Sequence, residues 1–178
     1  VLDSNNYSHD FDGMRSQLVL ELLYNCGLRV SELIGLSFKD VDYSRSEVKV
    51  LGKGNKERSI PIGGNLVSLI KNFSVIRNNE GFNSMPNDKL IVSDKGTDAY
   101  PMLISRIVNK VLKRYANVSK TNPHVLRHTF ATHLLNNGSD INAIKDLLGH
   151  ESLASTSVYM HNSIERLKDV YKNSHPRK

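Results

Sequence analysis

The chain has 178 residues, with 24 Lys and Arg against 18 Asp and Glu, a formal net charge of +6 and a pI of about 9.4. This length fits one domain with its own core, and the charge favours a polyanion such as nucleic acid as partner. The single Cys26 excludes an intramolecular disulfide, and no apolar run approaches the roughly 20 residues of a membrane span. We expect a cytoplasmic protein with no membrane partner.

The first residues differ from the rest in composition. The chain opens at Val1 without an initiator methionine and continues with polar, acidic sequence up to Asp12. We interpret residues 1–12 as a linker or arm of a longer protein and residues 13–178 as one domain.

A helix and a hairpin are predicted next. Apolar residues from Met14 to Cys26 recur every four positions, and Gly27 stands where a C-terminal cap would end that helix, so Arg29 follows the helix end. Glu47 to Leu51 and Arg58 to Ile62 alternate as two strands around Gly52-Lys53-Gly54-Asn55, which places Lys53 near the tip of a hairpin.

Three further elements follow the hairpin. Leu66 to Ile76 has helical periodicity, and Leu90 to Val92 is a candidate short strand. A third helix carries apolar residues from Ile104 to Tyr115 on one side. Its opposite side is basic and carries Arg106, Lys110 and Lys113. The stretch from Pro101 to Arg127 contains six Lys or Arg and no Asp or Glu, so we predict that it binds nucleic acid.

The last third is predicted to be helical. Pro123 behind Asn122 starts a helix that Gly138 ends, and His124 and Arg127 share one face of its first turns. Asp140 caps a second helix that ends at Gly149, which leaves His150 in the following turn. A short helix then carries Tyr159, and Ser163 to Asn173 forms a last helix. The fold class is therefore mostly α with a small antiparallel β-sheet (α+β).

Two arginines suggest phosphoryl chemistry. Arg29 and Arg127 could each offer a two-pronged, permanently charged fork to a phosphate. Alternatively, both are surface arginines paired with carboxylates, and Glu32 lies three residues after Arg29. The two interpretations are compatible if Glu32 orients the guanidinium.

The histidine spacing raises a metal site as an alternative. His124 and His128 are four residues apart and His133 follows, which is compatible with zinc. However, no Glu follows His124, no Cys pair exists, and His133 projects to the opposite side of the helix from His124. We therefore expect no metal and no cofactor.

A family resemblance rests on residues that the chain contains in this order: Arg29, Lys53, His124, Arg127, His150 and Tyr159. Together they resemble the catalytic set of the tyrosine recombinases, or phage integrases. The most specific stretches are PHVLRHTFATHLLN at Pro123 to Asn136, LLGH at Leu147 to His150, and His175-Pro176-Arg177. The sequence between them is similar to the XerC and XerD branch. The resemblance covers nearly the whole chain after about Phe11.

The resemblance implies roles for these residues. Tyr159 would be the nucleophile that forms a covalent 3′-phosphotyrosine link to DNA and leaves a free 5′-hydroxyl. Lys53, with Lys56 as the alternative, would protonate the departing 5′-oxygen. His124 or His150 would accept the tyrosine proton, and His124 fits the family pattern better. Arg29 and Arg127 would bind the phosphate, with Glu32 in support.

The resemblance also implies a reaction and partners. The chain would be the catalytic domain of a site-specific recombinase that cleaves, exchanges and religates DNA strands, with an N-terminal DNA-binding domain truncated before it. It would be a monomer in isolation and a tetrameric synapse on double-stranded DNA, with the helix from 163 to 173 contacting a neighbouring protomer. The expected DNA contacts are Lys56, Arg58, Arg106, Lys110 and Lys113.

Three alternatives stay open at this point. A mobile-element integrase of the same family differs only in its substrate. A type IB topoisomerase uses the same tyrosine chemistry but relaxes supercoils as a monomer. A non-catalytic DNA-binding protein would bind in a salt-sensitive manner and form no covalent adduct.

Overall fold

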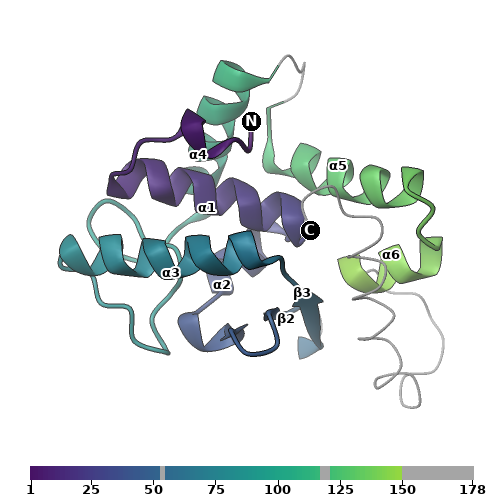
Figure 1. Cartoon of the computed structure of the whole chain (residues 1–178), viewed down its shortest axis with the longest axis horizontal. Helices are drawn as coiled ribbons and strands as arrows, with labels where there is room; N and C mark the ends of the chain where they lie inside the picture. The colour runs from purple at the N-terminus through teal and green to yellow at the C-terminus, as the bar shows by residue number, and fades with distance from the viewer. Residues whose placement is uncertain (53–54, 117–120, 150–178) are drawn as a thin grey trace.

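The computed structural model describes residues 1–52, 55–116 and 121–149 (Figure 1). Lys53, His150, Tyr159 and the predicted helix from 163 to 173 lie outside these residues. The described part is mostly helical with a small antiparallel sheet, which confirms the predicted fold class. Its elements are α1 (Phe11–Asn25), α2 (Val30–Gly35), β1 (Val41–Asp42), β2 (Glu47–Leu51), β3 (Glu57–Pro61), α3 (Gly64–Asn79), α4 (Pro101–Tyr115), α5 (Pro123–Asn136), α6 (Ile141–Leu148) and two short 3-10 turns, Ser4–Asn6 and Phe38–Asp40.

Helix α1 is the centre of the fold. It contacts α2, α3, α4 and α5, and Figure 1 shows it between α4 above and α3 below. Its apolar residues are buried, and so are the charged Arg15 and Glu21, as expected for a helix that is covered on nearly every side. Burial also raises the pKa of the Cys26 thiol at its end to about 12, so this cysteine stays protonated and unreactive.

The predicted hairpin is confirmed. Strand β2 pairs antiparallel with β3, with Val50 opposite Arg58, and β3 begins one residue earlier than the sequence indicated. A third strand, β1, pairs with the other edge of β2 and was not predicted. Val48 and Ile60 point into the core from the same face of the sheet. The hairpin therefore runs from the buried Val48 and Ile60 to the exposed Leu51 and Glu57.

The predicted short strand at Leu90 to Val92 is not formed: only two isolated bridges occur here, one made by Lys89 and one by Val92. Their side chains are fully buried in the core, which explains the apolar run. Their backbone groups are bonded partly to separate backbone segments, with the Leu90 amide donating to the Leu36 carbonyl at 2.8 Å, and partly to arginine side chains. Arg77 donates to the carbonyls of Lys89 and Leu90, and Arg15 donates to the carbonyl of Val92 at 3.1 Å. A buried apolar run can thus satisfy its backbone without a sheet.

Helices α4 and α5 follow their predicted bounds closely. Helix α4 buries its apolar side, including Ile104 and Val108, and exposes the basic side. Helix α5 begins at Pro123, and the side chain of Asn122 accepts a hydrogen bond of 3.3 Å from the Val125 amide. The Asn122 cap and the proline at the first helical position therefore fix where α5 begins.

The predicted arm, residues 1–12, is itself partly packed on the domain. Tyr7 is buried, the Tyr115 hydroxyl of α4 donates to the Asn6 carbonyl at 2.9 Å, and α1 already begins at Phe11. The assignment of this segment to a longer protein stays a prediction. Among the described residues, no helix combines the length and the apolarity that a bilayer crossing requires.

Candidate active site

The end of α1 brings the first arginine into place. Gly27 has φ of +57° and reverses the chain after α1, so that Arg29 becomes the N-cap of α2 three residues after Cys26. A side chain at position 27 would clash, since its Cβ would lie 2.6 Å from a ring carbon of Phe130 on α5. Glycine is therefore required here both by the left-handed backbone and by the close approach of α5.

Glu32 pairs with Arg29, so the two interpretations left open by the sequence are compatible. Its Oε2 accepts from the Arg29 backbone amide at 2.8 Å, and its Oε1 accepts from Arg29 Nη1 at 2.9 Å. The carboxylate therefore caps the first turn of α2 and also orients the guanidinium. The Arg29 side chain remains one-third exposed, at 33%, whereas that of Glu32 is 4% exposed.

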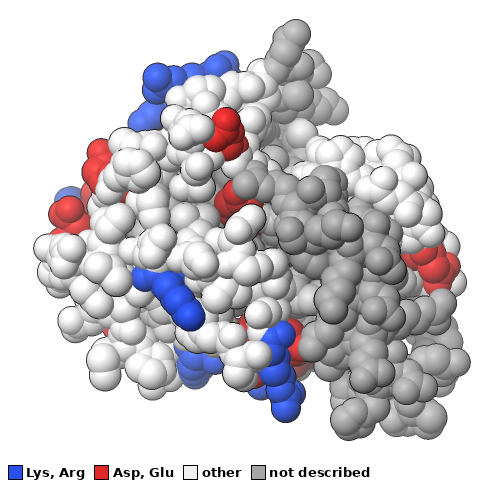
Figure 2. Space-filling model, viewed as in Figure 1, with Lys and Arg blue, Asp and Glu red and all other residues white. Residues whose placement is uncertain are grey.

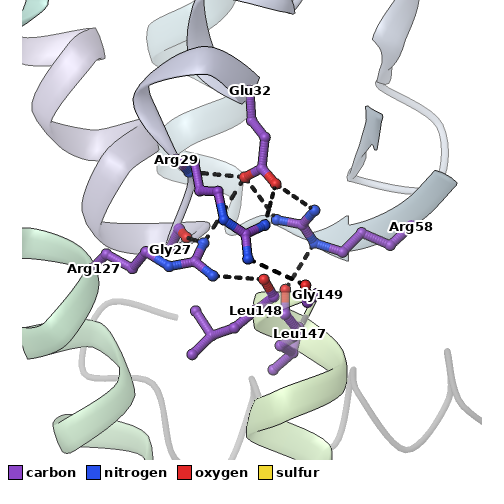
Figure 3. A network of polar contacts seen from close by, with 8 residues as sticks. All are labelled: Gly27, Arg29, Glu32, Arg58, Arg127, Leu147, Leu148 and Gly149. Carbon is purple, nitrogen blue, oxygen red and sulfur yellow. Dashed lines mark hydrogen bonds and ion pairs between the residues drawn. The ribbon is translucent and has the colours of Figure 1, made fainter. Parts of the chain in front are cut away.

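Arg127 reaches the same place from α5. Its Nη1 donates to the Gly27 carbonyl and lies 3.9 Å from Glu32 Oε2, and its Nη2 donates to the Leu148 carbonyl at 2.6 Å. Figure 3 shows Arg29 and Arg127 side by side between Glu32 and the end of α6. The structure thus brings together two arginines that are 98 positions apart in the numbering.

A third arginine, Arg58 of β3, joins them. Its Nη1 and Nη2 donate to the two carboxylate oxygens of Glu32, each at 2.9 Å, and its Nε donates to the Leu147 carbonyl at 2.9 Å. From the sequence, Arg58 was a predicted DNA contact. In the structure all three of its nitrogen atoms have protein acceptors, and its side chain is 14% exposed.

The C-terminal end of α6 accepts from all three arginines. Consecutive carbonyls bind different guanidiniums: that of Leu147 binds Arg58, that of Leu148 binds Arg127, and that of Gly149 binds Arg29 at 3.2 Å (Figure 3). The last carbonyls of a helix have no partner within the helix and carry a partial negative charge. The arginines therefore cap α6 and hold its end at Gly149 in place.

The electrostatics of this cluster keep both Glu32 and Arg127 charged at neutral pH. Burial would raise the pKa of Glu32, but the hydrogen bonds from Arg58 and from the Arg29 amide outweigh it and the pKa lies below its ordinary value. Burial, with the positive charge of Arg29 next, lowers the pKa of Arg127 to about 10. Three arginines and one carboxylate thus leave an excess of two positive charges for an anion.

The histidines have different surroundings. His124 is exposed in the first turn of α5, three residues before Arg127, as predicted. His133, which entered the zinc alternative, faces α1 instead, where the Tyr24 hydroxyl lies 2.7 Å from its Nδ1. Within residues 1–52, 55–116 and 121–149, no three His, Cys, Asp or Glu side chains gather as metal ligands would.

The predicted DNA contacts on α4 lie together on its exposed side. Arg106, Lys110 and Lys113 are all exposed, and Arg106 also donates to the Tyr100 hydroxyl at 2.5 Å. On the face seen in Figure 2, the largest group of basic side chains lies at the upper edge, where Figure 1 places α4. Lys56, another predicted contact, is exposed beside the hairpin loop.

Sequence reasoning missed two contributions to the site. It did not recognise Arg58 as the partner of Glu32, although strand alternation places Arg58 on the same face as the buried Ile60 and so indicated an inward side chain. It also missed the carbonyls that bind the arginines. Backbone carbonyls leave no signal in a sequence, apart from the two glycines, Gly27 and Gly149, that mark the helix ends.

The chain matches the Phage integrase family over residues 2–166. It is 41% identical over 172 residues to the tyrosine recombinase XerC of Chlorobaculum parvum, and 44% identical over 165 residues to that of Staphylococcus haemolyticus. Each alignment covers 93% of this chain but only 51% and 55% of the relative. The chain therefore spans about half the length of the curated relatives it matches.

Solved structures give the same picture. The XerA recombinase is 34% identical, with a TM-score of 0.70, over 93% of this chain and 60% of that one. The XerH site-specific recombinase bound to a palindromic difH substrate, in a post-cleavage complex, is 26% identical, also with a TM-score of 0.70, over 89% of this chain and 45% of that one.

Proposed function

The chain belongs to the phage integrase family, and on this basis we propose that it is the catalytic part of a tyrosine site-specific recombinase of the Xer type. Its reaction would be the cleavage, exchange and religation of DNA strands. One observation carries the proposal: the fold gathers Arg29 and Arg127 at one point, with an excess of two positive charges, beside the α5 turn that carries His124.

The arginine pair would bind the scissile phosphate. A phosphodiester carries one negative charge, and more charge develops on its non-bridging oxygens as a nucleophile attacks. Arg29 and Arg127 can stabilise that charge with forked N–H donors. Phosphate oxygens would then replace their present acceptors, the carbonyl of Gly149 for Arg29 and that of Leu148 for Arg127. The exchange replaces two neutral acceptors by an anion, and the excess of two positive charges in the cluster offsets its negative charge, so we expect no metal to be needed.

Tyr159 would be the nucleophile. Its phenol oxygen attacks phosphorus, the bond from phosphorus to the 5′-oxygen breaks, and a 3′-phosphotyrosine and a 5′-hydroxyl result. His124 would accept the phenol proton, with His150 as the other candidate, and Lys53 would give a proton to the departing oxygen. Religation is the reverse reaction with a 5′-hydroxyl from the partner strand, so it needs no ATP.

The DNA duplex would lie across the exposed basic side of α4 and the β2–β3 hairpin. The resemblance to a XerH complex with its DNA substrate supports this partner. Because the relatives are about twice as long, the complete protein would carry a second DNA-binding domain, and four protomers would act together on two sites in the cytoplasm.

Covalent capture tests this function. The substrate is a pool of nicked duplexes with randomised arms, incubated with the protein in EDTA and then denatured. Strand cleavage next to the nick releases a short 5′-hydroxyl product, so the covalent complex cannot religate and accumulates. We expect a denaturant-resistant protein–DNA band in the wild type and none in Tyr159→Phe. Mass spectrometry should map the adduct to Tyr159.

Other outcomes would contradict the proposal. An adduct on another tyrosine would remove Tyr159 from its role. Salt-sensitive binding without any adduct would make the protein a DNA-binding protein, and relaxation of a supercoiled plasmid without joining of two sites would make it a topoisomerase. Sequencing of the captured pool also identifies the target site.

A further inference from the structure

We propose that Arg58 is a positioning residue for the phosphate-binding arginines: it neutralises Glu32, which leaves the charges of Arg29 and Arg127 available to a phosphate, and it separately supports the last turn of α6. This inference rests on the proposed function and deepens it. It assigns to Arg58 a role inside the catalytic centre, in place of the DNA contact that its charge alone suggested.

The contacts of Arg58 argue against a DNA-binding role. Two parallel hydrogen bonds of 2.9 Å join its terminal nitrogens to both oxygens of Glu32, and Nε is taken by the Leu147 carbonyl at the same distance. Such a bidentate pair has strict geometry, which a side chain reaching for solvent would not keep. With 14% of the side chain exposed, the guanidinium is largely withdrawn from any DNA surface.

The charges explain why the pair is needed. Glu32 must be present because it caps α2 and orients Arg29, yet its carboxylate also attracts the two arginines that should face a phosphate. Arg29 Nη1 lies 2.9 Å and Arg127 Nη1 lies 3.9 Å from its oxygens. Arg58 supplies the matching positive charge. Without it, the excess charge of the cluster falls from two to one, and the carboxylate competes with the phosphate.

The second contribution of Arg58 is steric. Gly149 has φ of +62° and lies directly on the Arg58 guanidinium, since a Cβ at this position would be 3.2 Å from Nη1. Arg58 therefore supports the turn whose carbonyl binds Arg29 and from which the chain continues to His150. Because Arg58 stands on β3, it also ties the hairpin of the Lys53 loop to the arginine cluster.

The first experiment compares Arg58→Met and Arg58→Lys with Arg45→Met as a matched control. Arg45 belongs to the turn between β1 and β2 and loses the same charge, but its side chain is 72% exposed and its ion pair with Asp42 spans 3.9 Å. Single-turnover cleavage of the captured nicked duplex is measured, together with the Kd for the duplex and its dependence on salt.

We expect Arg58→Met to slow cleavage about 100-fold, as loss of preorganised charge at a transition state does, with the Kd and its salt slope changed little. Arg58→Lys keeps the charge without the fork and should recover part of the rate, and Arg45→Met should match the wild type. If Arg58→Met instead weakens binding, lowers the salt slope and cleaves normally once bound, Arg58 is a DNA contact and the proposal is overturned.

A second experiment changes the carboxylate as well as the arginine. It separates the loss of charge neutralisation from a simple loss of structure. Adding Glu32→Gln to Arg58→Met removes the uncompensated negative charge, so the double variant should cleave about tenfold faster than Arg58→Met alone, a strong coupling between neighbours. Thermal unfolding of each variant shows whether it is folded. A double variant slower than Arg58→Met would contradict the charge argument.

Failure of the proposed function is recognised independently. If the wild type forms no covalent adduct, the recombinase assignment fails, whatever Arg58 does.

The ion pair between Arg58 and Glu32 is tested separately, by ¹³C NMR titration of the Glu32 carboxyl without DNA. Its pKa should rise in Arg58→Met and stay unchanged in Arg45→Met. An unchanged pKa in Arg58→Met would overturn the proposal even if cleavage were slow.

Discussion

Glu32 and Arg58 lie 26 positions apart in sequence and are joined by two hydrogen bonds of 2.9 Å. This pair links α2 to the hairpin, and both side chains are largely withdrawn from solvent. Loss of one partner from a buried pair leaves the other charge uncompensated, which costs more than the pair itself contributes. The stability of the domain should therefore depend on this carboxylate.

We predict that Glu32→Gln lowers the free energy of unfolding at pH 7 by about 3 kcal/mol. The pKa of Glu32 is lowered in the folded state, so its stabilising contribution is complete above the ordinary carboxyl pKa and is lost as the pH falls through the lowered value. The difference between variant and wild type should accordingly shrink below about pH 4. Urea unfolding from pH 3 to 8 measures it. Glu57→Gln, an exposed carboxylate of β3, is the control and should change little.

Gly27→Ala should destabilise the protein by about 3 kcal/mol or more, because it combines a left-handed backbone with overpacking against Phe130. Gly64→Ala, at the start of α3 with nothing within 4 Å of the added methyl group, should stay within about 0.5 kcal/mol of the wild type. Urea unfolding distinguishes them. Equal effects at both positions would mean that α5 can move away from Gly27 at little cost.

Removal of the charges at Arg106, Lys110 and Lys113 together should weaken duplex binding and reduce the slope of log K against log salt by about 2 to 3 for three phosphate contacts. The control removes the same number of charges at Lys39, Lys71 and Lys95, exposed lysines outside α4. Binding is measured by fluorescence anisotropy at several salt concentrations. An unchanged slope in the α4 variant would mean that this side of the helix faces solvent and does not contact DNA.

The Lys53→Ala variant should barely cleave an ordinary phosphodiester. It should cleave a 5′-bridging phosphorothiolate almost as fast as the wild type does, because sulfur leaves without a proton. Arg29→Ala and Arg127→Ala should show no comparable rescue, since their charges act on non-bridging oxygens. Rescue is read from single-turnover rates on the two substrates. Rescue of Lys56→Ala instead of Lys53→Ala would assign the proton to Lys56.

Much of this fold could be predicted because its signals are local. The end of α1 at Gly27, the hairpin around Gly52 and the Asn122 cap of α5 each depend on a few neighbouring residues, and each is confirmed. The buried run at Leu90 was misjudged, since periodicity does not distinguish a short strand from a core segment held by scattered backbone bonds and arginine side chains.

The site was predictable only in its residue types. Arg29 and Arg127 could be named because the order of residues resembles a family, and Glu32 because it lies three residues after Arg29. The structure brings these three side chains together. The partnership of Arg58 with Glu32 is long-range and depends on how β3 meets α2, which no local pattern contains. Roles for Lys53, His150 and Tyr159 stay predictions, because these residues lie outside the described part of the chain.

The carbonyls of Leu148 and Gly149 have a consequence for selectivity. In the resting protein they already occupy N–H donors of Arg127 and Arg29, so the site holds an internal competitor for any incoming anion. A free phosphate ion must displace these carbonyls without any other contact to the protein. A phosphate within a duplex that is already bound elsewhere on the protein arrives at a high effective concentration and displaces them readily. Free phosphate in the cell should therefore be a poor inhibitor.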